Sequence, residues 1–276
     1  MMPIAPLLML ASGALHAVVN AILKSGGDKM SSRALIDGSS ALLVLPFALW
    51  MRFPWASLPW LAGSMLVHVI YLVCLIKAFE TADMSAVYPV MRGSAPALAA
   101  AVAVLFLGDP ISWTVVAGIS LVTAGTLAVA WWNTPGSKAL AWALATGAMT
   151  ALYTVLDAQG SRAAGSAFDY IVWFFLTLGG TIGLLFAVWR GPVFLLTARE
   201  QWKPGLIAGA LSLGTYGLAL AAYRLGDVPR LAAIRESSIL FGVAIALFVL
   251  KERVGKARML GACAIAAGTV VLLTRP

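Results

Sequence analysis

Charged side chains inside long apolar runs are the residues of this sequence most able to carry chemistry. Arg235 and Glu236 lie side by side near the start of the run from Leu231 to Gly261, and Arg92 occupies a similar place in an earlier run. A charge at that depth in a bilayer costs roughly 2.5–3.5 kcal/mol, so it is seldom retained without a partner or a task. The arginines therefore indicate a site for an anionic group, a contact between helices, or side chains that reach lipid headgroups.

Further polar residues in these runs lie three or four positions apart, which puts each pair on one face of a helix. Such pairs are typical of interhelical hydrogen bonding and packing, and equally of side chains that line a cavity. Asp157, near a predicted helix end, is also compatible with a plain acid at the membrane interface. We interpret the following residues as a binding set for a small molecule: His16, Asn20, His68, Tyr71, Tyr88, Arg92, Tyr153, Tyr216 and Ser237.

The sequence lacks the residue patterns of an enzyme or a metal centre. It has two histidines and two cysteines without metal-ligand spacing, no GxSxG motif and no phosphate-binding glycine loop. Cys74 and Cys263 both fall in apolar runs, where a cysteine is most often a small packing residue. We therefore expect no catalytic residue, no bound metal and no cofactor.

The composition identifies lipid as the surrounding solvent. Of 276 residues, 61% are hydrophobic and 11% are charged, whereas a soluble domain carries about 25% charge. The net charge of +8 comes from 19 basic residues in short clusters between apolar runs. That distribution is typical of contacts with anionic headgroups and of topology control, so we expect a bilayer and no nucleic acid as partner.

The apolar runs must supply the helices that position these residues. A crossing needs about 20 mostly apolar residues, and the runs show no alternation of the kind found in barrel strands. We therefore expect an all-α membrane protein with ten transmembrane helices, at residues 5–23, 34–51, 58–79, 85–107, 111–132, 139–157, 167–189, 204–223, 229–250 and 256–274.

The sequence is internally duplicated. Residues 92–128 align without a gap on residues 235–271 at an offset of 143, which pairs Arg92 with Arg235 and Gly118 with Gly261. We place the first five-helix repeat at residues 1–133 and the second at 139–276. Because five is odd, the second repeat must enter the membrane inverted. Inverted repeats place a binding site near the midplane between the halves, which alternating access exposes to each side in turn.

Several local motifs resemble a known family. Each half has an arginine near the start of its fourth helix, which ends in LGDP or LKER, and then a helix that contains GISLVTAGT or GACAIAAGT. This pattern resembles the EamA-type branch of the drug/metabolite transporter superfamily. The first half departs from it at Asp109, where a glutamate is usual, and at Pro110. The resemblance implies a ten-helix carrier of the bacterial inner membrane, often an exporter of amino acids or related compounds.

We therefore expect a transporter, and not an enzyme, that exports amino acids or similar metabolites. Asp157, Arg235 and Glu236 are predicted to act in coupling or gating, because a carboxyl group in a low dielectric can exchange a proton at physiological pH. Protons are thus possible partners. Because Glu236 stands next to Arg235, we expect Arg92 to be freer for substrate or gating and Arg235 to be more structural. Alternatives are a carrier of sugar or nucleotide conjugates and a membrane enzyme whose arginines clamp a lipid phosphate.

The loop charges predict the orientation. Of the 19 basic residues, Arg92 and Arg235 lie within spans and twelve lie on the face opposite the N-terminus. The N-terminal face carries five: Arg52, Arg162, Arg224, Arg230 and Arg275. The positive-inside rule then places both termini in the periplasm. A reporter active only in the cytoplasm, fused after Pro276, should give no signal, and a strong signal would overturn this orientation.

Overall fold

The computed structural model describes residues 4–25, 29–108, 111–128, 135–249, 251 and 255–274, and helices account for nearly all of them. The α-helices are α1 (Ile4–Ser25), α2 (Lys29–Val44), α3 (Leu58–Thr81), α4 (Met84–Val102), α5 (Trp113–Ala128), α6 (Ser137–Ala163), α7 (Ala167–Phe174), α8 (Gly180–Arg190), α9 (Pro192–Leu225), α10 (Val228–Arg235), α11 (Ser238–Ala244) and α12 (Lys256–Thr274). Two 3₁₀ turns, η1 (Leu45–Leu49) and η2 (Trp55–Ser57), and three π-helical turns, η3 (Ala103–Leu107), η4 (Phe175–Gly179) and η5 (Ile245–Val249), extend or join them. Each predicted run coincides with one of these helices or with a continuous series of them.

Eight helical segments of the described chain are long and apolar enough to cross a bilayer, where the sequence predicts ten. The other two, in α5 and α12, are shorter apolar helices. The predicted run 111–132 continues into residues outside the described part, and α12 begins with the basic Lys256. Large apolar side chains such as Leu66, Val73 and Leu184 are exposed in the middle of their helices. Lipid accommodates such side chains and water does not, so the chain is a multi-pass membrane protein.

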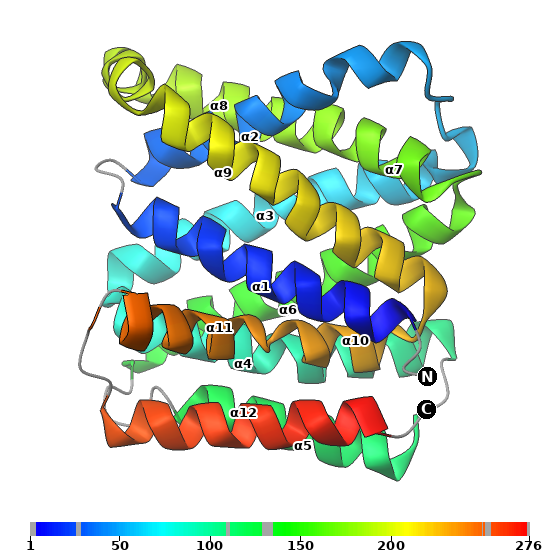
Figure 1. The fold of residues 1–276 in the computed structure, drawn as a ribbon, viewed down its shortest axis with the longest axis vertical. Coiled ribbons are helices and arrows are strands. Elements are labelled where there is room, and N and C mark those ends of the chain that lie inside the picture. Colours follow the sequence, from blue (N-terminus) through cyan, green and yellow to red (C-terminus); the bar gives the residue numbers. More distant parts are fainter. Residues whose placement is uncertain are drawn as a thin grey trace.

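The helices run roughly parallel or antiparallel to a common direction and form a single stack in Figure 1. Helices α2, α8 and α9 lie at one end of this stack, and α5 pairs with α12 at the other. Between them α1 packs on α9 and α6 on both α3 and α4. Both chain termini lie at the same edge of the molecule (Figure 1), in agreement with an even number of crossings.

Glycines bring α5 and α12 into close antiparallel contact. A Cβ on Gly125 would lie 2.7 Å from the carbonyl oxygen of Gly261, and one on Gly268 would lie 2.8 Å from that of Gly118. At the offset of 143, Gly118 corresponds to Gly261 and Gly125 to Gly268. Replacing each residue by its equivalent in the other half therefore turns one contact into the other. Small residues of this kind allow helices in membranes to associate through close packing of their backbones.

A second glycine contact occurs once in each half of the sequence. Gly13 of α1 lies against Ser237, at the break between α10 and α11, and Gly147 of α6 lies against Ser94 of α4. In both places a Cβ would be 3.0 Å or less from the serine hydroxyl oxygen. These glycines let the first helix of each half approach the polar residues that follow the two arginines in sequence.

The fourth helix of each half ends in the same backbone conformation. Both α4 and α11 continue into a π-helical turn, η3 and η5. Gly108, directly after η3, has a φ of +67°, and Lys251, two positions after η5, has a φ of +52°. Residues 108 and 251 are again 143 apart. A left-handed residue is a usual way to end a helix, and it costs a lysine more than a glycine.

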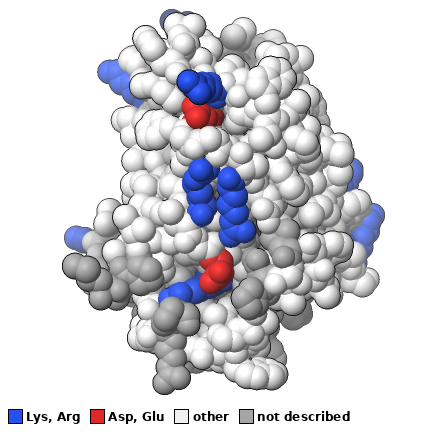
Figure 2. Space-filling model, turned by 90° about the vertical axis from the view of Figure 1, so that its right-hand side faces the viewer, with Lys and Arg blue, Asp and Glu red and all other residues white. Residues whose placement is uncertain are grey.

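Arginines at the edge that holds the termini satisfy the carbonyl groups at helix ends. Arg162 of α6 donates to carbonyls at the end of α9, and Arg224 of α9 donates to carbonyls at the end of α6, so the two helix ends clasp each other. Arg230 donates to the Leu272 carbonyl of α12 at 2.7 Å. Figure 2 shows this edge, where charged side chains form a narrow line across a mostly uncharged surface. Three of the basic residues on this face thus cap helix C-termini, which leave carbonyls unpaired.

The α5–α12 contact gives a direct test of packing. Gly125→Ala would force the backbones of these helices apart, because its Cβ meets the Gly261 carbonyl oxygen and the Ile265 amide within 3 Å. We expect a destabilisation of about 1–3 kcal/mol, measured as a lower thermal unfolding midpoint in detergent. Gly242→Ala in α11 is the matched control, because nothing lies within 4 Å of its Cβ position. Equal midpoints for both variants would contradict the proposed role of the contact.

Candidate functional site

Aromatic rings from four helices meet in the interior. His68 of α3 stacks on Tyr153 of α6, with ring centroids 4.0 Å apart, and Tyr71 meets the same tyrosine edge-on at 5.6 Å. Phe174 of α7 stacks on Tyr216 of α9 at 5.1 Å and lies 6.0 Å from His68. Four residues of the predicted binding set therefore lie together, and Phe174 lies beside them. The four are His68, Tyr71, Tyr153 and Tyr216.

The imidazole of His68 is held by its own helix. Its Nδ1 atom lies 2.9 Å from the Ser64 carbonyl oxygen and 3.2 Å from the Ser64 hydroxyl, one turn earlier in α3. Both side chains are buried. This contact fixes the plane of the ring and so presents its face to Tyr153.

Asp157 is a fully buried carboxyl group beside the ring cluster. The hydroxyl of Tyr216 donates to its Oδ2 atom at 2.5 Å and that of Tyr170 to its Oδ1 atom at 3.2 Å. Tyr170 reaches it across Gly160, where any Cβ would lie within 2.6 Å of the phenol ring. Within the described ranges no basic side chain forms an ion pair with Asp157. The predicted helix end at residue 157 is wrong, because α6 continues six residues further to Ala163.

Glu236 pairs with the arginine of the other half. The Nη2 atom of Arg92 lies 3.0 Å from Glu236 Oε1, and both side chains are largely buried. The acid next to Arg235 in sequence thus forms its ion pair with Arg92, so Arg92 is less free than the sequence suggested. Adjacent residues of a helix point in different directions, so Glu236 faces α4 and its neighbour does not. The guanidinium of Arg92 is therefore held by contacts within the protein.

Arg235 lies in the interior and forms no ion pair among the described residues. Its side chain is 8% exposed, and its guanidinium carbon lies 4.9 Å from the centroid of the Tyr216 ring. Among the described residues its Nε atom has no hydrogen-bond partner. The Ser237 hydroxyl, at the adjoining helix break, is also buried without one. A buried polar group without a hydrogen-bond partner costs about 1–3 kcal/mol of folding free energy, so the groups left unpaired here lower the stability of the protein.

The remaining predicted residues border this region with fewer contacts. His16, Asn20 and Tyr88 are half-buried and form no hydrogen bond or ring contact with any described residue. His16 lies within electrostatic range of both Arg92 and Arg235. Among the described residues, these three side chains therefore form no interhelical hydrogen bond.

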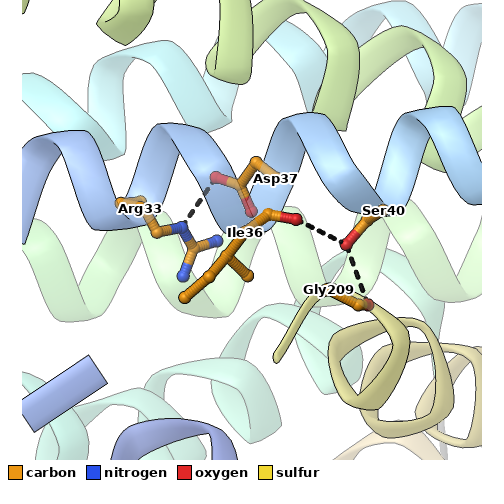
Figure 3. A network of polar contacts seen from close by, with 5 residues as sticks. All are labelled: Arg33, Ile36, Asp37, Ser40 and Gly209. Atoms are coloured by element: carbon orange, nitrogen blue, oxygen red, sulfur yellow. Dashed lines mark hydrogen bonds and ion pairs between the residues drawn. The ribbon is translucent and has the colours of Figure 1, made fainter. Parts of the chain in front are cut away.

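A second ion pair was missed by the sequence analysis. Arg33 Nε lies 2.7 Å from Asp37 Oδ2, one turn further along α2. Figure 3 shows this pair and, on the next turn, the Ser40 hydroxyl 3.0 Å from the Gly209 carbonyl oxygen of α9. The signal was present, because a basic and an acidic residue four positions apart in an apolar run indicate an intrahelical ion pair.

Helix α7 was also missed as a contributor. It supplies Tyr170 and Phe174, both buried, although the expected site used only the first, third, fourth, sixth, eighth and ninth helices. Tyr170 begins an uninterrupted apolar and aromatic stretch, residues 170–176, so periodicity cannot distinguish it from ordinary core. The contact of Ser64 with His68 could not be predicted from the sequence pattern either.

Comparison with known proteins assigns the chain to a family. A model of the EamA-like transporter family matches residues 137–274, which is half of the sequence. The chain belongs to the EamA-like transporter family. The predicted resemblance is thereby confirmed, and the protein is a membrane transporter of small molecules. The family match contains Tyr153, Asp157, Tyr216, Arg235 and Glu236.

Solved structures share the fold of this EamA-like protein. Chains of solved structures, 28 in number, resemble it. One, described only as a crystal structure of a protein, superposes with a TM-score of 0.78 over 100% of both chains. At 16% sequence identity this likeness concerns the fold alone. A search of curated proteins gave no match.

The ion pair between the halves predicts strong coupling in a double-mutant cycle. Arg92→Ala or Glu236→Ala alone leaves a buried charge without its partner, which costs about 3–5 kcal/mol. The double variant removes both charges, so its loss in unfolding free energy should be well below the sum of the single losses. The exposed pair Lys77–Glu80 is the control, because its coupling should be about 0.2–1 kcal/mol. Additive losses for Arg92 and Glu236 would show that the ion pair contributes nothing.

Proposed function

We propose that this EamA-like protein exports amino acids or similar small metabolites across the bacterial inner membrane by alternating access. Its two halves, residues 1–133 and 139–276, would act as inverted five-helix repeats. The observation that carries the proposal is the group of charged and aromatic side chains that both halves contribute inside the membrane. Such groups are expensive within a bilayer and commonly mark a substrate pathway.

Paired contacts support the inverted repeats. Under the offset of 143, the glycine contacts of α5 with α12 exchange with each other, and the left-handed residues 108 and 251 correspond. The contact of Gly13 with Ser237 likewise has its counterpart in that of Gly147 with Ser94. A duplicated chain whose second copy entered the membrane in the same orientation would give no such reciprocal antiparallel contact. In this proposal α5 and α12 complete ten crossings.

The chemistry of the interior supports a zwitterionic substrate. The rings of His68, Tyr153 and Tyr216 offer apolar faces, and their polar atoms offer hydrogen bonds. Buried charges of both signs, on Arg235 and Asp157, lie beside them. Amino acids combine a carboxylate, an ammonium group and a side chain of variable size, and this set of groups matches all three.

The orientation and direction of transport complete the proposal. The termini would lie in the periplasm, because most basic loop residues lie on the opposite face. Three of the five arginines on the terminal face bond to helix-end carbonyls, so their presence there does not argue against this orientation. Export is the direction that the resemblance to the family favours.

Transport by the purified protein in liposomes tests the function. Radiolabelled proteinogenic amino acids, presented singly, should enter vesicles that contain the protein faster than protein-free vesicles. A pH gradient across the membrane should drive accumulation above equilibrium. A sugar phosphate and a nucleotide sugar serve as negative controls. Transport of these two with none of the amino acids would replace the proposed substrate class.

Asp157 is the carboxyl group best suited to carry the coupling proton. Glu236 is already paired with Arg92, whereas Asp157 accepts hydrogen bonds from hydroxyl groups and forms no ion pair among the described residues. Asp157→Asn should therefore retain amino-acid exchange at equal concentrations and lose accumulation driven by a pH gradient. Asp169→Asn, at the start of α7, is the matched control and should keep both activities. Undiminished pH-driven accumulation by Asp157→Asn would exclude this residue as the proton carrier.

A further inference from the structure

Helix α9 is longer than a bilayer crossing requires, and it bends near its start. Its 34 residues would extend about 51 Å at about 1.5 Å per residue, whereas the hydrocarbon core is about 30 Å thick. The backbone leaves helical geometry at Gln201, with φ −117° and ψ 18°. Pro204 accounts for the bend, because its ring has no N–H and clashes with the carbonyl four residues earlier. Residues 202–225 suffice for the crossing, and residues 192–200, the lateral segment, are not needed for it.

The lateral segment lies across the direction of the other helices. Figure 1 shows these yellow-green turns end-on at the upper left, while the rest of α9 runs across the view. Gly191, between α8 and α9, has a φ of +50° and open space around its Cβ position, and so permits the sharp change of direction. The segment therefore follows the plane of the bilayer, at the edge opposite the termini.

Contacts with the protein determine which face of the lateral segment is turned outward. Thr197 is buried, and Phe194 packs against the apolar cluster to which Phe186 of α8 belongs. At the bend, the Ser32 hydroxyl of α2 lies 3.4 Å from Oε1 of Gln201. These contacts hold one side of the segment against α2 and α8, so its other side faces away from the protein.

The outward face combines large apolar side chains with basic ones. Leu195 is 68% exposed and Leu196 is 62% exposed. Arg199 follows them by four and three positions, which places it on the same face, and it is exposed without an ion pair among the described residues. Just beyond the bend, the exposed Lys203 places its ammonium group 5.5 Å from the ring centroid of Trp202.

Only the boundary between lipid and water suits this combination. Water disfavours exposed leucines, and the hydrocarbon core disfavours an arginine. At the boundary, leucines reach the acyl chains while a long basic side chain extends to the headgroups. Trp189 and Trp202, exposed on either side of the lateral segment, belong to the residue type that is enriched at this depth.

The charge of this region favours an anionic partner. Arg199 and Lys203 are accompanied by one acid, Glu200, so the contact surface carries a net positive charge. A guanidinium also matches the geometry of a phosphate group, to which it can donate two hydrogen bonds. A second copy of the same surface would bring like charges together, whereas phospholipid supplies both acyl chains and phosphate.

We propose that the lateral segment, together with Trp202 and Lys203, is a binding surface for anionic phospholipids. Leu195 and Leu196 lie among the acyl chains, and Arg199 and Lys203 bind the phosphate groups. Through Gln201 this surface is attached to α2. The inference goes beyond the proposed function and does not depend on the transported substrate, because it concerns the outer surface of α9 and not the interior.

A fluorescent label at one position measures which lipids surround it. The full chain with Cys74→Ala and Cys263→Ser receives a single cysteine, Leu196→Cys, and is placed in phosphatidylcholine discs. A small fraction of the lipid is brominated on its acyl chains, as phosphatidylglycerol or as phosphatidylcholine, because bromine quenches only a label that it contacts. Both lipids should quench this label, and phosphatidylglycerol should do so several-fold more strongly. In the same cysteine background, Val73→Cys, exposed in the middle of α3, should be quenched equally by both.

Removal of charge tests the basic residues. Each basic residue near an anionic headgroup contributes about a fivefold change in affinity. With Arg199→Gln and Lys203→Gln added, both lipids should therefore quench the label at position 196 equally, and the leucine-side contact with lipid should persist. Lys138→Gln with Lys256→Gln is the matched control, because both lysines are exposed at the same edge of the molecule. This control should keep the preference for phosphatidylglycerol.

Three outcomes would overturn the inference. Equal quenching at position 196 with all basic residues present would show that the surface does not select anionic lipid, whatever the variants do. An equal loss of preference in the control variant would assign the effect to the charge of the whole face. If neither lipid quenches this label while both quench the one at Val73→Cys, the segment is not in lipid. Disulfide formation between copies through Leu196→Cys would then identify it as an interface between two chains.

Discussion

A charge in the membrane interior is costly unless it is paired, and one such ion pair joins the two halves of the chain. The pair between Arg92 and Glu236 joins α4 of the first half to the helix break of the second, at 3.0 Å. Breaking a buried pair costs several kcal/mol, because each charge has already lost its water. The glycines at positions 13 and 147 bring α1 and α6 against the same region, so the packing around the centre follows from where these charges must lie.

The helices and the duplication could be predicted because they depend on local pattern. Run lengths and hydropathy determine which segments can be helices in lipid, and the offset of 143 identifies residues that the fold uses in equivalent ways. The partner of Glu236 could not be predicted in the same manner. Which helix an acid faces depends on the packing of α4 against the break after α10, and adjacency in sequence suggested Arg235. Tyr170 and Phe174 were missed for the same reason, since only tertiary contact distinguishes them from other core aromatics.

The two halves share a pattern but differ in detail. Helix α4 continues through Ser94, between Pro89 and Pro96, whereas the corresponding helix of the second half breaks at Glu236 and Ser237. The break rotates Glu236 toward Arg92 and places Arg235 over Tyr216. One sequence motif thus yields a paired arginine in the first half and an unpaired arginine in the second. The duplication accounts for the shared arrangement of helices, and the break in the second copy accounts for the different contacts of the two arginines.

The ends of the molecule are also unlike. At the edge that holds the termini, Arg162 and Arg224 tie the ends of α6 and α9 together through each other's carbonyls. At the opposite edge, in the described residues, Lys77 of α3 bonds only to Glu80 of its own helix. If the halves are inverted repeats, as we propose, α6 and α9 correspond to α1 and α3, and the described residues of those two helices form no such clasp. An open state of a carrier has unlike contacts at its two ends, so under the proposed alternating access the clasp between α6 and α9 would be one of the contacts that break when this edge opens.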